Sequence, residues 1–242
     1  MSQASLRHLR RGGAAADMRA IVPRFALVVA GLLAGCIDGA GNDRAPAPRR
    51  GVSRPPAWAV PPGPETRACL ADLSREQVRY SLAPDQDFGG GCRIVGAVLL
   101  NDIGVPVAGL KALRCGAARA FTGWVRHAVV PAAHQLLGSD VVRVETYGSY
   151  ACRNVIGNAA ASRRLSGHAM ANAVDVAAFV LADGRRITVA AHWRSADPRV
   201  RAFFRSVYGS ACKRFGTVLS PDYNYAHRDH FHLEDDGARF CQ

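Results

Sequence analysis

Residues 166–175 read SGHAMANAVD and residues 227–232 read HRDHFH, and these two stretches decide the fold and the chemistry that we expect. Together they contain four of the chain's eight histidines. Asp175 precedes the apolar run VAAF, and the second stretch ends with two histidines separated by one apolar residue. Short apolar or alternating runs of this kind are consistent with strands that border a core. We therefore expect both stretches to bring polar side chains to strands of one buried sheet.

The spacing of His230 and His232 predicts that both side chains point into one pocket. Side chains two residues apart share a face of a strand, so Phe231 and Leu233 should face the opposite side. Asp175 would be a carboxylate on a buried strand, which is costly unless it is paired or bound to a metal. Imidazole and carboxylate ligands suit Zn²⁺, and three protein ligands leave a fourth position for water. Taken separately, these residues also fit structural histidines and a paired aspartate.

Taken jointly, the two stretches resemble a known metal signature. SGHxxxxAxD followed by HxH is similar to the signature of the D-Ala-D-Ala carboxypeptidases and dipeptidases and of the penicillin-insensitive murein endopeptidase. The resemblance implies that His168, Asp175 and His232 bind zinc, which would activate a water for hydrolysis. It also implies that Arg153, at the end of YGSYACR, faces the substrate. A guanidinium there could clamp a carboxylate through two hydrogen bonds, and a plain surface arginine is the alternative.

A closer similarity covers nearly all of residues 67–242. It rests on GSYACR (148–153), on LSxHAxxNAxDV (165–176), on the His192-Trp193 pair and on VLxPDYNxAHxDHFHLE (218–234). On these motifs the chain resembles the bacterial extensin-like C-terminal family.

The two groups of enzymes that the motifs resemble, dipeptidases and endopeptidases, differ in the residues that transfer the proton. The dipeptidase branch has a glutamate base where this chain has Asp229, whereas the endopeptidase branch has the spacing HxxHxH of His227, His230 and His232. A histidine with a pKa near 6.5 can act as acid or base at neutral pH. We expect His230 to carry the proton with His227 supporting it. Asp229 is the alternative base, or a partner that orients a ligand histidine.

The N-terminus has the features of an export signal. Arg19 and Arg24 precede an apolar run at residues 25–35, which is too short to cross a bilayer that needs about 20 residues. The ending LAGC resembles a bacterial lipobox, so we expect Cys36 to carry a lipid. We expect residues 1–17 to be untranslated or disordered and residues 18–36 to be a lipoprotein signal peptide. Residues 37–66 would form a proline-rich linker, and residues 67–242 one domain.

The remaining six cysteines fit an exported protein, because an even number in an oxidising compartment predicts disulfides. They are Cys69, Cys92, Cys115, Cys152, Cys212 and Cys241. Three disulfides are expected, with 15 possible pairings. Beyond residue 35 the chain holds 26 basic and 18 acidic side chains. An exported protein seldom meets nucleic acid, so an anionic wall polymer or membrane surface is the partner that this charge favours, and a generally basic surface is the other interpretation.

The pattern of apolar residues predicts an irregular series of helices and strands rather than a strict alternation. Helices are expected at 66–73, at 115–137 with a break at Pro131, and from Asp197 to about residue 212; strands are expected at 92–100, 141–150, 173–181, 186–190 and 230–234. This order favours the α+β class, with a small antiparallel sheet flanked by helices. The resemblance implies the fold of the D-Ala-D-Ala metallopeptidases and of the hedgehog signalling domain.

From this we expect a zinc-dependent peptidase that hydrolyses peptide bonds in peptidoglycan. It would be a monomer held by its lipid on the periplasmic side of a bacterial membrane. The alternative is a catalytically inactive lipoprotein that keeps the metal for stability and binds the cell wall. Ala171 keeps this alternative open, because many relatives in the resembled superfamily have glycine there.

Overall fold

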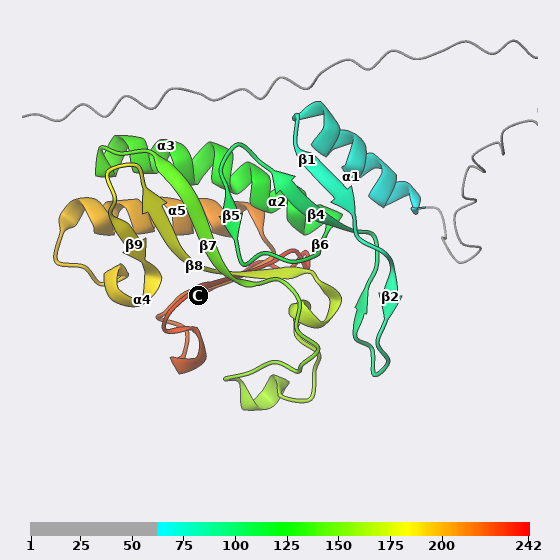
Figure 1. Ribbon diagram of the computed structural model, residues 1–242. Coiled ribbons are helices and arrows are strands. Elements are labelled where there is room, and N and C mark those ends of the chain that lie inside the picture. Colours follow the sequence, from blue (N-terminus) through cyan, green and yellow to red (C-terminus); the bar gives the residue numbers. More distant parts are fainter. Residues whose placement is uncertain (1–61) are drawn as a thin grey trace, which may run out of the picture. The chain divides into compact units, whose positions relative to one another are not determined.

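The computed structural model describes residues 62–242, which fold around one seven-stranded sheet with helices on one face (Figure 1). The strands follow the order β12-β10-β11-β8-β7-β5, and β9 pairs with β8. A three-stranded sheet, β1-β4-β6, and the hairpin β2-β3 complete the β structure. The strands are β1 (Arg79–Leu82), β2 (Gln86–Asp87), β3 (Arg93–Ile94), β4 (Ala97–Asp102), β5 (Val107–Ala108), β6 (Leu113–Arg114), β7 (Val141–Gly148), β8 (Ala173–Leu181), β9 (Arg186–Thr188), β10 (Thr217–Leu219), β11 (Phe231–Glu234) and β12 (Phe240–Cys241).

The α+β class is confirmed, but the expectation of a purely antiparallel sheet is wrong at both edges. β5 runs parallel to β7, and β12 runs parallel to β10. The chain between β5 and β7 passes through a long helical segment, which is the crossover that a parallel pair requires. β12 is parallel to β10 because β11 turns back beside β10 and the chain then reverses once more.

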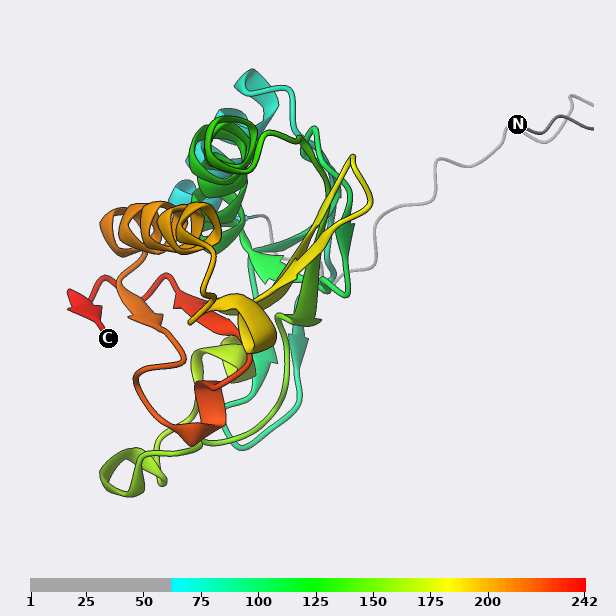
Figure 2. The ribbon, with the colours of Figure 1, turned by 90° about the vertical axis from the view of Figure 1, so that its left-hand side faces the viewer.

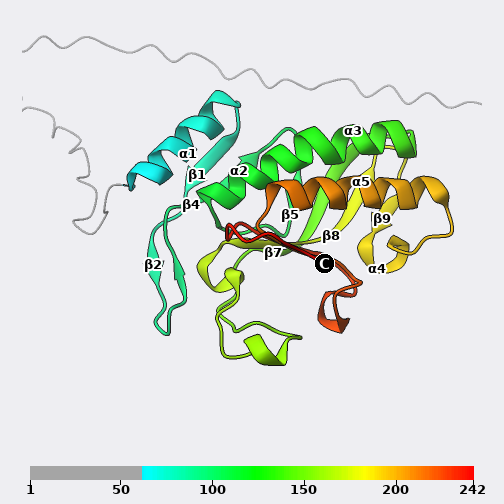
Figure 3. The same cartoon turned by 180° about the vertical axis from the view of Figure 1, so that it is seen from behind.

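The helices cover one face of the main sheet, and Figure 3 shows α5 (Pro198–Arg214) running beside the helical segment 115–137. This segment consists of α2 (Cys115–Trp124), η1 (Val125–Val129), α3 (Val130–Ala132) and η2 (Ala133–Leu137), and it contradicts the predicted break at Pro131. A proline lacks the N–H of an α-helical bond and crowds the preceding turn. Here π-helical turns precede and follow α3, so the helix widens around Pro131 instead of ending.

The core lies between these helices and the sheet, where aromatic rings pack face to edge. The Phe179 ring of β8 lies 5.2 Å from the Phe203 ring of α5 at an angle of 86°. Val174 and Leu233 are fully buried in the same core. Asp175 and His232, which are the neighbours of these two residues in their strands, therefore face away from the helices. Figure 2 shows the helices gathered on one side of the sheet. The predicted alternation in β11 is confirmed. In β8 the register shifts between Ala178 and Val176, so Val174 and Phe179 both reach the core although they are of unequal parity.

Three disulfides join the elements, as the cysteine count predicts. They link Cys69 with Cys115, Cys92 with Cys152, and Cys212 with Cys241. The first ties α1 (Pro64–Arg75) to α2, the second ties the β2-β3 hairpin to the loop after β7, and the third ties α5 to β12. These three bonds are one of the 15 pairings that the sequence left open. The bond between Cys92 and Cys152 fixes the loop that precedes Arg153.

Two element boundaries in the structure differ from those predicted from the sequence. The expected strand 92–100 is divided into β3 and β4, because Gly96 turns the chain with φ +61°. α1 begins at Pro64, inside the stretch expected to be linker, with a proline in its first turn where no N–H is needed. The expectations for residues 1–17, for the signal peptide at 18–36 with Cys36, and for the linker up to residue 61 lie outside the described residues. Within the described residues, no helix is both long and apolar enough to cross a bilayer.

Candidate metal centre

Asp175 and His232 meet because β8 and β11 are neighbours in the main sheet. The two residues are directly paired in the antiparallel register, so their side chains emerge side by side on one face. His232 Nδ1 lies 2.9 Å from Asp175 Oδ1. His168 Nε2 lies 3.0 Å from the same oxygen and 3.1 Å from His232 Nδ1. All three residues predicted as zinc ligands therefore converge, and each is buried.

His168 reaches this cluster from a short 3-10 turn, η4 (Gly167–Met170), that precedes β8. Ser166 caps the turn, and its hydroxyl accepts a hydrogen bond from the His168 backbone N–H at 3.4 Å. Ala171 ends the turn in the left-handed conformation with φ +51°. A residue with a Cβ costs about 1 kcal/mol in this conformation, a cost that glycine would avoid. The turn sends the chain straight into β8.

The protonation of the cluster follows from burial opposed by close charges. Burial disfavours the carboxylate of Asp175, but the imidazoles of His168 and His232 outweigh it and hold its pKa well below the usual range. Burial also disfavours the cationic form of His232, but Asp175 and Glu234 raise its pKa to about 9. Burial lowers the pKa of His227 to about 4, with the nearby His232 and His230 acting in the same direction. The metal-free cluster thus holds a carboxylate, a cationic His232 and a neutral His227 at pH 7.

His230 lies just before β11, beside the cluster rather than within it. Its Nδ1–H donates to Asp229 Oδ1 at 2.8 Å, and its Nε2 lies 3.6 Å from Asp175 Oδ1. Asp229 therefore orients His230, which is not one of the three candidate ligands. The two expected roles of Asp229, as base and as partner of a ligand histidine, stay predictions. His227 is held in turn by Asn224, whose amide oxygen accepts from His227 Nδ1–H at 2.7 Å.

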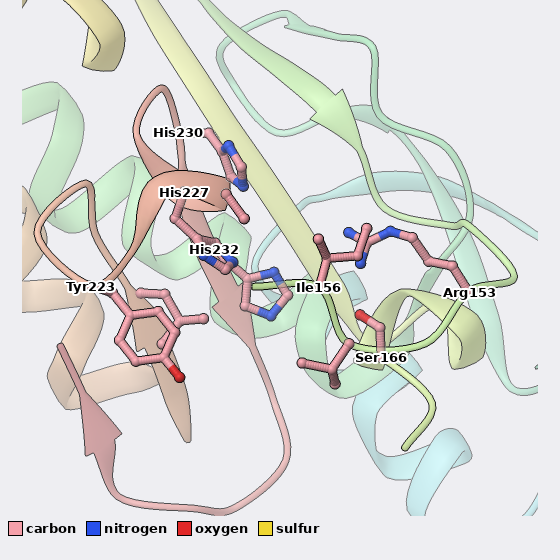
Figure 4. A pocket seen from close by; sticks show the side chains of 10 residues that line it. Arg153, Ile156, Ser166, Tyr223, His227, His230 and His232 are labelled. Carbon is pink, nitrogen blue, oxygen red and sulfur yellow. The ribbon is translucent and has the colours of Figure 1, made fainter. Parts of the chain in front are cut away.

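A cavity of about 110 Å³ opens beside these histidines (Figure 4). Arg153 lines it, and its guanidinium Nη2 lies 4.0 Å from Asp175 Oδ2. The apolar part of the wall comes from the loop after β7, from the end of β10 and from the segment between β10 and β11: Val155, Ile156, Leu219, Tyr223 and Ala226. His192 is not among the lining residues, since its ring nitrogen Nδ1 contacts Thr188 at the start of α4 (Val189–His192). Arg153 thus lies beside the three candidate ligands, and its expected contact with a substrate stays a prediction.

Sequence reasoning missed three contacts of the site. Glu234 Oε2 accepts from His232 Nε2–H at 3.2 Å, and Asn224 orients His227. Tyr147, at the end of β7, places its ring 5.7 Å from that of His230 with an edge-on geometry. Only the HFHLE motif carried a signal for Glu234, because a residue two positions after His232 shares its face of the strand.

The chemistry of the donor set fits a divalent transition metal. Two imidazole nitrogens and one carboxylate oxygen are ligands that zinc accepts. Zinc bonds of about 2.0–2.2 Å in a tetrahedral arrangement place ligand atoms about 3.3–3.5 Å apart. The ligand atoms of His168, Asp175 and His232 lie 2.9 to 3.1 Å apart, so side-chain movements of a few tenths of an ångström would accommodate the ion.

The fold and the site together define an α+β domain with a buried cluster of two histidines and one aspartate, flanked by a third histidine and an arginine. The model of the family described as "Extensin-like protein C-terminus" matches residues 67–242, and the chain belongs to this family. The family expectation from the sequence is thereby confirmed. No curated protein was found to match the chain, and no solved structure matches it either.

Proposed function

We propose that this domain is a zinc-dependent peptidase that hydrolyses peptide bonds in peptidoglycan. The observation that carries the proposal is the convergence of His168, Asp175 and His232 at the edge of one cavity. His232, His230 and Arg153 line this cavity, and the last two lie beside Asp175. We include in the proposal the link to the D-Ala-D-Ala metallopeptidase superfamily and its hedgehog-like fold, which rests on the SGHxxxxAxD and HxH motifs. A zinc ion at this site would supply Lewis-acid polarisation of the scissile carbonyl and of the attacking water.

His230 is the residue best placed to move a proton. Because its Nδ1–H donates to Asp229, its Nε2 is free to accept a proton on the side that faces the cluster. The same nitrogen can then return the proton to the leaving amine. Asp229 stabilises the imidazolium that forms between the two steps. His227 supports the arrangement, since its ring lies 5.2 Å from that of His230 and is itself held by Asn224.

Arg153 is suited to binding a substrate carboxylate. Its side chain lines the cavity and lies at the edge of the cluster, 4.0 Å from the Asp175 carboxylate. The guanidinium offers several parallel donors, and a peptide carboxylate accepts two of them in a planar fork. Peptidoglycan stem peptides provide carboxylates of this kind, which makes them the substrate class we favour. The proposal keeps the lipid-anchored, periplasmic location expected from Cys36, and a monomer that does not bind nucleic acid.

The first test is the metal content of the purified, oxidised protein, measured by plasma mass spectrometry. We expect about one zinc per chain, lost in both His168→Ala and Asp175→Ala. His134→Ala is the matched control, because His134 is an exposed histidine that pairs with Asp140 far from the cluster along the chain. Wild-type protein without metal, from cells grown with zinc, would refute the metallopeptidase proposal.

The second test separates an enzyme from a metal-stabilised wall-binding protein. His230→Ala should keep its zinc, because His230 is not one of the three cluster ligands. It should nevertheless lose at least about 100-fold in hydrolysis of purified sacculi if His230 transfers the proton. Equal wall binding by both proteins without release of peptide fragments from either would instead favour the non-enzymatic alternative.

A further inference from the structure

Glu234 is a largely covered carboxylate that contacts one hydrogen-bond partner, His232. It ends β11, and its side chain is 17 % exposed. The only hydrogen bond of the Glu234 side chain among the described residues joins Oε2 to His232 Nε2, at 3.2 Å. Within the described chain no arginine or lysine lies at ion-pair distance from it. A carboxylate removed from water is costly unless a strong donor compensates it, so the N–H of His232 is what stabilises Glu234.

The two nitrogens of His232 face opposite partners. Nδ1 points to the ligand atoms of Asp175 and His168, at 2.9 and 3.1 Å. Nε2 points to Glu234. A neutral imidazole carries its proton on one nitrogen only, so a carboxylate at Nε2 selects the tautomer in which the Nδ1 lone pair faces the cluster. A partner on the far nitrogen also raises the basicity of a ligand histidine.

Gly167 makes this arrangement possible by leaving space. A Cβ at this position would lie 2.3 Å from the carboxyl carbon of Glu234 and 2.4 and 2.6 Å from its oxygens. The backbone of Gly167 is not in the left-handed region, so a glycine is not required for its conformation. The missing side chain is therefore explained by the volume that the Glu234 carboxylate occupies.

We propose that Gly167 and Glu234 act as one positioning unit that fixes the tautomer and orientation of His232 and so sets the metal affinity of the site. This inference rests on the proposed metal centre and adds two residues that do not touch the metal. It links the two sequence motifs physically: the glycine of SGH makes room for the glutamate of HFHLE. Losing a partner of this kind typically weakens metal binding by about 10–100-fold.

The test measures zinc affinity by competition with a chromophoric chelator, using the full chain. Glu234→Ala should weaken binding by about 10–100-fold. Glu234→Gln should lose less, because its amide oxygen can still accept from His232 Nε2–H but carries no charge. Gly167→Ala should resemble Glu234→Ala, since the new methyl group displaces the carboxylate. The three atoms nearest to the new methyl group all belong to the Glu234 carboxyl group, so the double variant Gly167→Ala/Glu234→Ala should bind no more weakly than Glu234→Ala.

A second glycine provides the matched control. A Cβ at Gly116 would lie 2.4 Å from Asp235 Oδ2, a comparably close approach to a carboxylate that is not part of the cluster. Gly116→Ala should therefore leave zinc affinity within about twofold while affecting stability in a similar way. Long-range proton–nitrogen NMR of the zinc-loaded protein should show the His232 proton on Nε2, and its signal should shift in Glu234→Ala.

Two results would overturn the inference alone: wild-type zinc affinity in Glu234→Ala, or losses from Gly167→Ala and Glu234→Ala that simply add in the double variant. In either case the metal centre itself would remain. A wild-type chain that binds no zinc would overturn the proposed function and this inference together, and the two failures are thus distinguishable.

Discussion

Zinc binding to the metal-free protein should release about one proton per ion at pH 7. The proton comes from His232, whose pKa of about 9 in the metal-free cluster is set by Asp175 and Glu234 against the effect of burial. With this pKa, about 99 % of His232 is cationic at pH 7, and its Nδ1 must lose a proton before it can bind a metal. Asp175, with its lowered pKa, is already a carboxylate and releases none.

The assay is isothermal titration calorimetry of zinc into metal-free protein, in buffers of different ionisation enthalpy at one pH. The slope of the observed heat against the ionisation enthalpy gives the number of protons, expected to be about one. The apparent affinity should also rise by roughly tenfold per pH unit between pH 7 and 8.5, because proton and zinc compete for one nitrogen. The rise should level off near pH 9, where His232 is half deprotonated.

His227→Gln is the control for this prediction. Burial and the nearby histidines lower the pKa of His227 to about 4, so it carries no proton to lose at neutral pH. Glutamine can keep the hydrogen bond to Asn224 that His227 makes. The variant should therefore release the same number of protons as the wild type. A zinc titration with no buffer dependence, or with an affinity that does not change between pH 7 and 8.5, would refute the account of the charge on His232.

Three further predictions concern stability and positioning. The pKa of His232 is raised in the metal-free fold, so cationic His232 stabilises the fold fully below its ordinary pKa of about 6.5, and this contribution is lost as pH rises through about 9. In urea unfolding of metal-free protein, the free energy of unfolding should fall by about 2 kcal/mol between pH 7 and 9. This loss should be absent in His232→Gln. Replacing Cys92 and Cys152 together by alanine opens a loop of 60 residues and should cost about 4 kcal/mol by urea unfolding. The same change should raise KM more than it lowers kcat, because Arg153 follows Cys152 directly; an unchanged KM would contradict the proposed role of Arg153. Phe179→Ala should lower the free energy of unfolding by about 3–5 kcal/mol in thermal or urea unfolding. It should keep the zinc stoichiometry, since the Phe179 ring lies in the core on the helix side of the sheet. Loss of metal in a folded variant would contradict this separation of core and site.

Local geometry alone was sufficient to predict much of the site. A strand alternates its side chains by covalent geometry, and this places His232 opposite to Phe231 and Leu233 whatever the rest of the fold does. The same rule places Asp175 away from the core-facing valines beside it. The resemblance of the SGH and HFH motifs to a known signature supplied the residues that we propose as ligands. Capping by Ser166 is also local, since the hydroxyl bonds a backbone N–H two residues later.

Other features depended on segments far apart in the chain. The pairing of Asp175 with His232 is a strand register across 57 residues, and no local rule specifies it. The helix passes through Pro131 because packing against α5 and the sheet outweighs the local preference to end it, as tertiary contacts commonly override propensity. The parallel pairing of β5 with β7 and of β12 with β10 depends on where the chain re-enters the sheet after the segments that separate these strands.

The sequence by itself thus determined most of the periodic elements and the number of disulfides, because these follow from covalent geometry or counting. The three residues that we propose as ligands came from the resemblance of two motifs to a known signature. Only the tertiary structure decided which cysteines pair, that Asp229 orients His230, and that Gly167 makes room for Glu234. These depend on distances between side chains that are remote in sequence. Such distances are set by the packing of the helices on the sheet, which minimises the free energy of the whole domain rather than of any one segment.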